Sequence, residues 1–333
     1  SVEAEAEKEA EASVEIGLEA IAELAVEEEV EVEAEASVEA QVETKTEETE
    51  VEKKVDDGKS SSLVFSLTKP GDGSDTDPEG IPTRFLTMQK GNRENAKAAF
   101  EDTLKWREDN GINTILGDPH PKFDLCKKIF PVYIPGKDVS GHIVFVQRIG
   151  LIDFDYAEKN GVTGDDLLHH YMYMIEFCWN IVEPSPTGVM TTVIDLKGVC
   201  LKTFRDGNIR GFIKKFVKSM SDNYPQRSHK TLVINAPSWI NLVYKLVKPL
   251  LRASTRKKIM LLNGGKNQDQ VLIDIVGADH IPVELLKDPS LLEGGKEGAE
   301  SGVHVLSEIE EELRELTIST LEEHNVEMQE PVE

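Results

Sequence analysis

Short segments with few charges alternate with amphipathic segments along the middle of the chain, and this alternation constrains the fold most strongly. Period-two or continuous apolar patterns predict strands at Ile143–Arg148, Val189–Leu196, Thr231–Asn235 and Lys258–Leu262. Helical spacing of apolar residues predicts helices at Asn92–Asn110, Asp165–Val182, Arg205–Asn223 and near Gln268–Val276. Strands that alternate with helices in this way indicate an α/β fold whose sheet is largely parallel.

The formal net charge of -25 is distributed unevenly. Between Ile81 and Asp288 the chain has 29 Lys and Arg against 23 Asp and Glu, so the acidic surplus lies outside this body. A mildly basic body can meet an anionic membrane surface. The acidic tails argue against nucleic-acid binding, which favours a basic surplus. We therefore expect a transient anionic membrane partner, protein partners for the acidic tails and no nucleic acid.

The segments that flank the body differ from it in composition. Residues 1–68 are expected to form an acidic, disordered leader, because Ser1–Glu52 is a Glu/Ala/Val repeat with dense like charge. Residues 69–82 form a Gly/Pro/Asp linker. Residues 289–333 are an acidic tail with one amphipathic helix, which predicts either a weak docking helix or a short coiled coil. Its apolar positions are Val305, Leu306, Ile309, Leu313, Leu316 and Leu321.

Cysteine usage and the absence of targeting patterns bear on the compartment. Cys126, Cys178 and Cys200 are widely spaced and odd in number, so they match neither a metal pattern nor a disulfide framework. The sequence shows no signal-peptide pattern and no apolar run long enough to span a bilayer. We expect a reducing, cytoplasmic location with peripheral membrane association.

The segment SWINLVYKLVKPLLRAST, at Ser238–Thr255, is nearly continuous in apolar residues. A helix from Trp239 to Leu251 would be about 20 Å long, which is shorter than the hydrocarbon core of about 30 Å. Its polar residues would form one narrow stripe, made of Asn241, Lys245, Lys248 and Arg252. Such a wide apolar arc needs apolar neighbours on two sides. Either protein covers both sides, or protein covers one side and lipid the other.

Motifs for catalysis are absent from the sequence. There is no G-x-S-x-G elbow, and Asn263-Gly264-Gly265-Lys266 lacks the spacing of a P-loop. His169 and His170 are adjacent, so they point to different faces of a helix and make a poor metal pair. No nucleophile, base and orienting group assemble. We expect a binding module rather than an enzyme, with no metal and no cofactor.

Several ordered motifs resemble one family. RFLTMQKGNRENAKAAFEDTLKWREDNGINTIL at Arg84–Leu116 is similar to the helical lead-in of CRAL-TRIO domains. VIDLKG at Val193–Gly198, SDNYPQRSHKTLVINAP at Ser221–Pro237 and the following KLVKPLL resemble the family's most recognisable run. The resemblance covers Ile81–Leu286 and extends to the family's yeast-type phosphatidylinositol/phosphatidylcholine transfer proteins. The acidic leader is similar to that of plant patellins.

This resemblance implies a fold and a division of the body. It implies a small helical lobe at residues 83–120 and a lipid-binding domain at residues 121–288. The mixed, mostly parallel sheet would form the floor of an apolar pocket, and Ser238–Thr255 would be a movable gate helix over it. The implied pocket and gate residues are Phe145, Met190, Trp239, Leu242, Val243, Leu246, Val247 and Leu250.

The resemblance also implies residues that hold a lipid head group. Family members that bind phosphatidylinositol use a Pro-Glu-Arg run and a Thr and Lys before the next strand. Pro225, Arg227, Thr255 and Lys258 match these positions, and Gln226 replaces the Glu. Of the phosphatidylcholine positions, Thr192 matches, whereas Met190 replaces a Ser and Phe145 a Tyr. A retained cation suits a phosphate better than a zwitterion, which favours a phosphoinositide.

The expected function is therefore exchange of a phospholipid, phosphatidylinositol or another phosphoinositide, with membranes through a gated pocket. A second interpretation is a lipid-sensing scaffold in trafficking or signalling, whose acidic tails recruit partners. An α/β hydrolase is the third, and the missing motifs disfavour it. Measured lipid movement between vesicles separates the first from the second.

Overall fold

A five-stranded sheet forms the centre of the computed structural model, which describes residues 80–199, 207–237, 239–240, 256–264, 266–292 and 307–332. The strand order is β1-β2-β3-β4-β5. β1 runs antiparallel to β2, and the other neighbouring strands are parallel. The bounds are Val132–Lys137, Ile143–Arg148, Met190–Asp195, Ser228–Ile234 and Ile259–Leu261. All four predicted strands are present, and the α/β prediction with a largely parallel sheet is confirmed.

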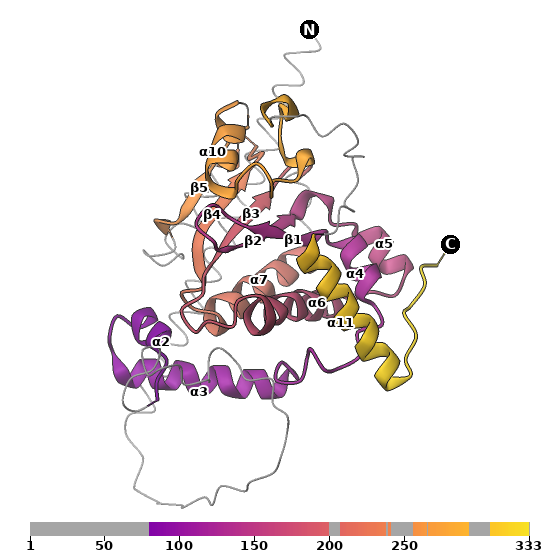
Figure 1. The fold of residues 1–333 in the computed structure, drawn as a ribbon. Coiled ribbons are helices and arrows are strands. Elements are labelled where there is room, and N and C mark those ends of the chain that lie inside the picture. Colours follow the sequence, from indigo (N-terminus) through magenta and orange to yellow (C-terminus); the bar gives the residue numbers. More distant parts are fainter. Residues whose placement is uncertain are drawn as a thin grey trace, which may run out of the picture.

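The predicted helices are present as well. They are α3 (Arg93–Asp109), α6 (Gly164–Phe177), α7 (Gly207–Asn223) and α10 (Lys266–Val276). The sequence interpretation missed three short helices, α2 (Thr83–Met88), α4 (Phe123–Ile129) and α5 (Phe154–Lys159). Figure 1 shows α6 and α7 on one side of the sheet, α10 on the other, and α2 with α3 in a lobe beyond α6.

Both faces of β2 are buried, which explains its continuous apolar sequence. Ile143 and Phe145 pack into the larger core cluster, together with residues of α4 and α6. Val144 and Val146 point to the opposite face and pack with Leu272 and other residues of α10 and the segment after it. Successive side chains of a strand alternate between faces, so a strand with helices on both sides must be apolar throughout.

α6 begins and ends with features that the sequence explains. Thr163 and Asp166 form a capping box, in which each side chain bonds the other residue's backbone N–H. A π-helical turn at Cys178–Val182 follows the helix directly. The single predicted helix at Asp165–Val182 therefore changes its hydrogen-bond pattern in its last five residues.

A buried ion pair connects the helical lobe to the sheet domain. Arg107, on α3, donates two hydrogen bonds to the carboxylate of Glu176 on α6, at 2.9 and 2.8 Å. The Tyr224 hydroxyl donates to the same carboxylate at 2.6 Å, and Asn180 donates to it at 3.0 Å. Both charged side chains are almost fully buried. The network fixes the position of α3 against α6 and the end of α7.

The helix of the acidic tail, α11 (Glu308–His324), packs against β1. Glu310 accepts a hydrogen bond from the backbone N–H of Ile134 at 2.6 Å, and Ser307 donates to the Ile134 carbonyl at 2.5 Å. Lys127 pairs with Glu310. Leu313 is fully buried in the larger core cluster. The helix thus docks on the molecule and satisfies backbone groups at the edge of the sheet.

Candidate functional site

Two residues predicted to hold a head group, Arg227 and Lys258, lie at one edge of the sheet together with the predicted pocket residue Met190. Met190 begins β3, Arg227 immediately precedes β4, and Lys258 immediately precedes β5. These strands are parallel, so their beginnings lie at the same edge. The Met190 N–H donates to the Arg227 carbonyl at 2.9 Å, and the Thr231 N–H donates to the Lys258 carbonyl at 2.9 Å. The local pairing of β3, β4 and β5 therefore fixes the backbone at these positions.

Lys258 is a partly exposed cation at this edge. Its ammonium donates a hydrogen bond to the Ser228 carbonyl at 2.5 Å. Burial of part of the side chain lowers the pKa of Lys258. A backbone carbonyl occupies one of the three ammonium donors, which leaves donor capacity for an anion at the start of β4 and β5.

Arg227 has a different environment, since it is 4% exposed. Its guanidinium donates to the carbonyls of Ser185 and Gly188, at 3.0 and 2.8 Å. It also lies over the ring of Trp179, 4.2 Å from the ring centroid. Burial and the nearby Arg84 guanidinium lower the pKa of Arg227. In this conformation Arg227 joins the turn at residues 185–188 to the end of the α6 segment.

Gln226 occupies the position where the family resemblance leads us to expect a glutamate. Its backbone φ is 60°, in the left-handed region that residues other than glycine seldom adopt. The side chain is half-buried. The backbone therefore turns sharply at Gln226 and directs the chain from the end of α7 into β4.

Phe145 and Met190, two described residues of the predicted pocket, belong to the larger core cluster. Phe145 is fully buried and packs edge-to-face on Tyr171, with ring centroids 5.4 Å apart. Thr192 pairs in register with Phe145 on one side and Thr231 on the other. Met190 is buried and Trp239 is half-buried. The predicted residues Leu242, Val243, Leu246, Val247, Leu250 and Thr255 lie outside the described residues, as do the leader and most of the linker.

A second polar cluster at the same edge was missed by the sequence interpretation. The Asp138 carboxylate is buried and accepts hydrogen bonds from the backbone N–H groups of Ser140 and His142 and from the Thr191 hydroxyl. Burial alone would raise the pKa of Asp138, but these bonds outweigh it and lower the pKa. His142 stacks on His229, with ring centroids 4.0 Å apart.

The stacked histidines lie beside Lys258 at this edge of the sheet. Burial lowers the pKa of His229, and the neighbouring His142 and Lys258 act in the same direction. A signal for this cluster was present in the sequence. His142 and His229 each stand at the beginning of a predicted parallel strand, and such beginnings meet at one edge.

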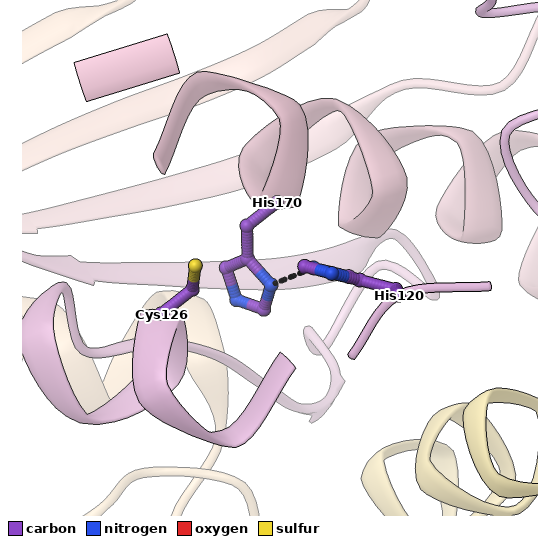
Figure 2. Close-up of side chains that lie close together, drawn as sticks. All are labelled: His120, Cys126 and His170. Carbon is purple, nitrogen blue, oxygen red and sulfur yellow. Dashed lines mark hydrogen bonds between the residues drawn. The ribbon is translucent and has the colours of Figure 1, made fainter. Parts of the chain in front are cut away.

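A third cluster, of buried His and Cys side chains, lies away from this edge. His120 Nε2 lies 3.0 Å from His170 Nδ1, and Cys126 lies next to His170. Figure 2 shows the three side chains converging from separate segments of the chain. The prediction that His169 and His170 make a poor metal pair considered only these two neighbours. It missed His120, which is 50 residues away in sequence.

Within the part of the chain that the structure describes, no helix combines the length and the apolar character needed to cross a bilayer. Of the three cysteines, Cys126 and Cys178 are free and buried, and Cys200 lies outside the described residues.

The comparisons with known proteins agree with one another. Residues 127–285 match the CRAL/TRIO domain. The phosphatidylinositol/phosphatidylcholine transfer protein SFH7 of Arabidopsis thaliana is 30% identical over 207 residues, which are 60% of this chain and 37% of that protein. The SEC14 cytosolic factor of Eremothecium gossypii is 28% identical over 222 residues, covering 64% of this chain and 70% of that protein.

The matched region is a limited part of some relatives. The chain spans 37% of the length of SFH7 and 43% of that of the related Arabidopsis protein SFH12. Among solved structures, the crystal structure of Sfh5 aligns with a TM-score of 0.46 and 20% identity, and the alignment covers 57% of this chain and 66% of that one.

Proposed function

We propose, from the premise that residues 127–285 of this chain are a CRAL/TRIO domain, that the protein binds a phospholipid and exchanges it between membranes. The observation that carries the proposal is this domain match, together with relatives that are named phosphatidylinositol/phosphatidylcholine transfer proteins. The role is binding and transfer rather than catalysis. The relatives named cytosolic factors support a cytosolic protein that visits membranes.

The preferred lipid is phosphatidylinositol or another phosphoinositide. Lys258 supports this preference because it presents a partly exposed ammonium at the beginnings of β4 and β5. Charge-assisted hydrogen bonds to phosphate are among the strong ones in proteins. In this proposal Lys258 contacts the head group directly. Arg227 positions the turn at residues 185–188 through its bonds to Ser185 and Gly188.

The apolar segment Ser238–Thr255 acts as the gate for lipid entry. Its support comes from the sequence, in which Leu242, Val243, Leu246, Val247 and Leu250 lie in a wide apolar arc beside a stripe of basic residues. A closed gate would bury this arc against the acyl chains. An open gate would place it in the bilayer, with Lys245 and Lys248 near anionic head groups. Phe145, Met190, Thr192 and Trp239 are the proposed contacts on the side of the pocket.

A lipid-sensing scaffold is the second candidate, and α11 favours it. This helix docks on β1 through Glu310 and Leu313. It leaves exposed glutamates on its outer side, namely Glu308, Glu311, Glu312, Glu315, Glu322 and Glu323. A rigid acidic surface next to a lipid-binding domain suits a basic protein partner.

Native mass spectrometry of the purified full chain tests lipid binding. The expected spectrum shows one phospholipid per protein, which tandem fragmentation identifies as phosphatidylinositol. Presentation of vesicles containing both lipids, followed by re-isolation, then compares phosphatidylinositol with phosphatidylcholine. A protein that carries no phospholipid before or after exposure to vesicles would overturn the proposed function. Stoichiometric phosphatidylcholine alone would overturn the head-group preference but retain lipid binding.

A further inference from the structure

Three segments bring His120, Cys126 and His170 together in the core. His120 lies in the connection between α3 and α4, Cys126 lies on α4, and His170 lies on α6. All three side chains are buried. One donor atom from each residue lies within 4.8 Å of the others. His169 is a fourth neighbour, with its ring centroid 5.3 Å from that of His120.

One nitrogen in this cluster is unsatisfied. His170 is 0% exposed, and its Nδ1 shares a hydrogen bond with His120. Its Nε2 is buried and has no hydrogen-bond partner among the described residues. If Nδ1 carries the proton, Nε2 is an unpaired lone pair; if Nδ1 accepts, Nε2 is an unpaired N–H. Figure 2 shows this ring beside the Cys126 side chain. A buried polar atom without a partner requires an explanation, and a bound ion is one.

We propose that His120, Cys126 and His170 bind a zinc ion. One thiolate and two imidazoles are ligands that zinc prefers, and structural zinc sites commonly combine Cys and His in a tetrahedron. His169 is the candidate for the fourth position after rotation of its side chain. The ion would join the connection after α3 to α4 and α6, and at His170 Nε2 it would accept the lone pair that has no partner among the described residues.

Metal binding at this cluster requires neutral imidazoles and a deprotonated thiol. Burial and the Asp166 carboxylate raise the pKa of Cys126 to about 12. The thiol therefore keeps its proton without a metal. Formation of the Zn–S bond releases this proton to solvent, one for each ion bound.

The charged groups that face the cluster are already paired. Lys127 pairs with Glu310, and Lys122 pairs with Asp166. The Cys126 thiol donates weakly to the Asp166 carbonyl at 3.8 Å. The thiolate and the divalent ion together add one positive charge, and the Asp166 carboxylate, which also pairs with Lys122, faces His120 and Cys126. The alternative is a purely structural His–His hydrogen bond, which the test below distinguishes.

Cobalt alone is the probe, because a thiolate bound to Co²⁺ produces a charge-transfer absorption that nitrogen and oxygen ligands do not. The full chain is purified, stripped with a chelator and titrated with Co²⁺. We expect the band to saturate at one equivalent and to disappear when Zn²⁺ is added. The variant Cys126→Ser should lose the band. The variant His142→Ala, in the separate Asp138–His142–His229 cluster, should retain it.

Two results would overturn the proposal. One is a wild-type protein that shows no thiolate band, and the other is a band that persists in Cys126→Ser. X-ray absorption at the zinc edge of the loaded wild-type protein provides a measurement that depends on no variant. The expected shell has one sulfur at about 2.3 Å and imidazole nitrogens at about 2.0–2.1 Å. A shell without sulfur would also contradict the site.

Discussion

Lys258 and Arg227 carry the same charge at the same edge of the sheet, but their surroundings assign them different roles. Arg227 is buried, stacked on Trp179 and bonded to two carbonyls. Lys258 is partly exposed and bonded to one carbonyl. A buried cation that bonds backbone carbonyls stabilises local structure, whereas a partly solvated one can bind an anion. The two residues are therefore not equivalent tests of head-group binding.

Replacement of Lys258 by Ala should weaken loading of phosphatidylinositol about tenfold or more. A charge-assisted hydrogen bond contributes about 1.5–3 kcal/mol, and about 1.4 kcal/mol corresponds to tenfold in affinity. Uptake of phosphatidylinositol from vesicles, measured by native mass spectrometry, gives the change. The adjacent exposed Lys257 provides the matched control, since Lys257→Ala removes a charge from the same segment. Equal losses of phosphatidylinositol loading for both variants would mean that Lys258 acts only through the general positive charge of this segment.

Replacement of Arg107 by Ala should lower the free energy of unfolding by about 3–5 kcal/mol, because it leaves the Glu176 carboxylate buried without its cation. Chemical denaturation monitored by tryptophan fluorescence measures the change. Lys215→Ala removes an exposed partner of Asp165 and should cost about 0–1 kcal/mol. A small change in the free energy of unfolding for Arg107→Ala would mean that the packing of the helical lobe does not depend on the Arg107–Glu176 ion pair.

At the scale of elements, α11 and the proposed gate segment, Ser238–Thr255, differ in how many of their residues are apolar. α11 buries a narrow face, and its N-terminal Ser307 and Glu310 satisfy backbone groups of Ile134. The helix predicted from the sequence of the gate segment would have a much wider apolar arc. The narrow apolar face of α11 is covered by one side of the molecule, where the helix meets β1, α4 and α6. A wide arc needs a second apolar surface, which the proposal supplies as lipid.

Leu313→Ala tests whether α11 is part of the folded core. Leu313 is 0% exposed and belongs to the larger core cluster. Truncation of such a residue costs about 2–5 kcal/mol, so the thermal midpoint should fall. Ile318, on the same helix, is 38% exposed, and Ile318→Ala should change the free energy of unfolding by about 0.5 kcal/mol or less. Matching midpoints for the two variants would mean that α11 is dispensable for stability.

Leu246→Glu tests the gate. Leu246 lies at the edge of the apolar arc, beside the polar stripe, so we expect the variant to keep most of its thermal stability while it loses vesicle binding and lipid exchange together. Ile318→Glu makes a similar change on α11 and should leave exchange intact. Thermal melts and fluorescent-lipid exchange are measured on the same samples. A collapsed melt would assign Leu246 to the core, and normal exchange would exclude contact between this position and the bilayer.

At the scale of the whole molecule, the sequence predicted the alternating α/β order because charge-poor strands and long amphipathic helices leave clear patterns. It missed β1, where Pro135 and Gly136 suggest a turn and the register with β2 shifts between Tyr133 and Gly136. It placed Met190, Arg227 and Lys258 at or just before the beginnings of predicted strands. The beginnings of parallel strands lie at one edge of a sheet. It missed the partners of Arg227 and the His120–Cys126–His170 cluster, because tertiary packing joins residues that no local pattern links.

The most direct test of the central claim is transfer of labelled phosphatidylinositol from donor to acceptor vesicles by the full chain. The account predicts that transfer rises in proportion to protein concentration, exceeds spontaneous exchange and falls about tenfold in Lys258→Ala but not in Lys257→Ala. A protein that binds phosphatidylinositol in native mass spectrometry yet moves none between vesicles would contradict transfer and favour the lipid-sensing scaffold.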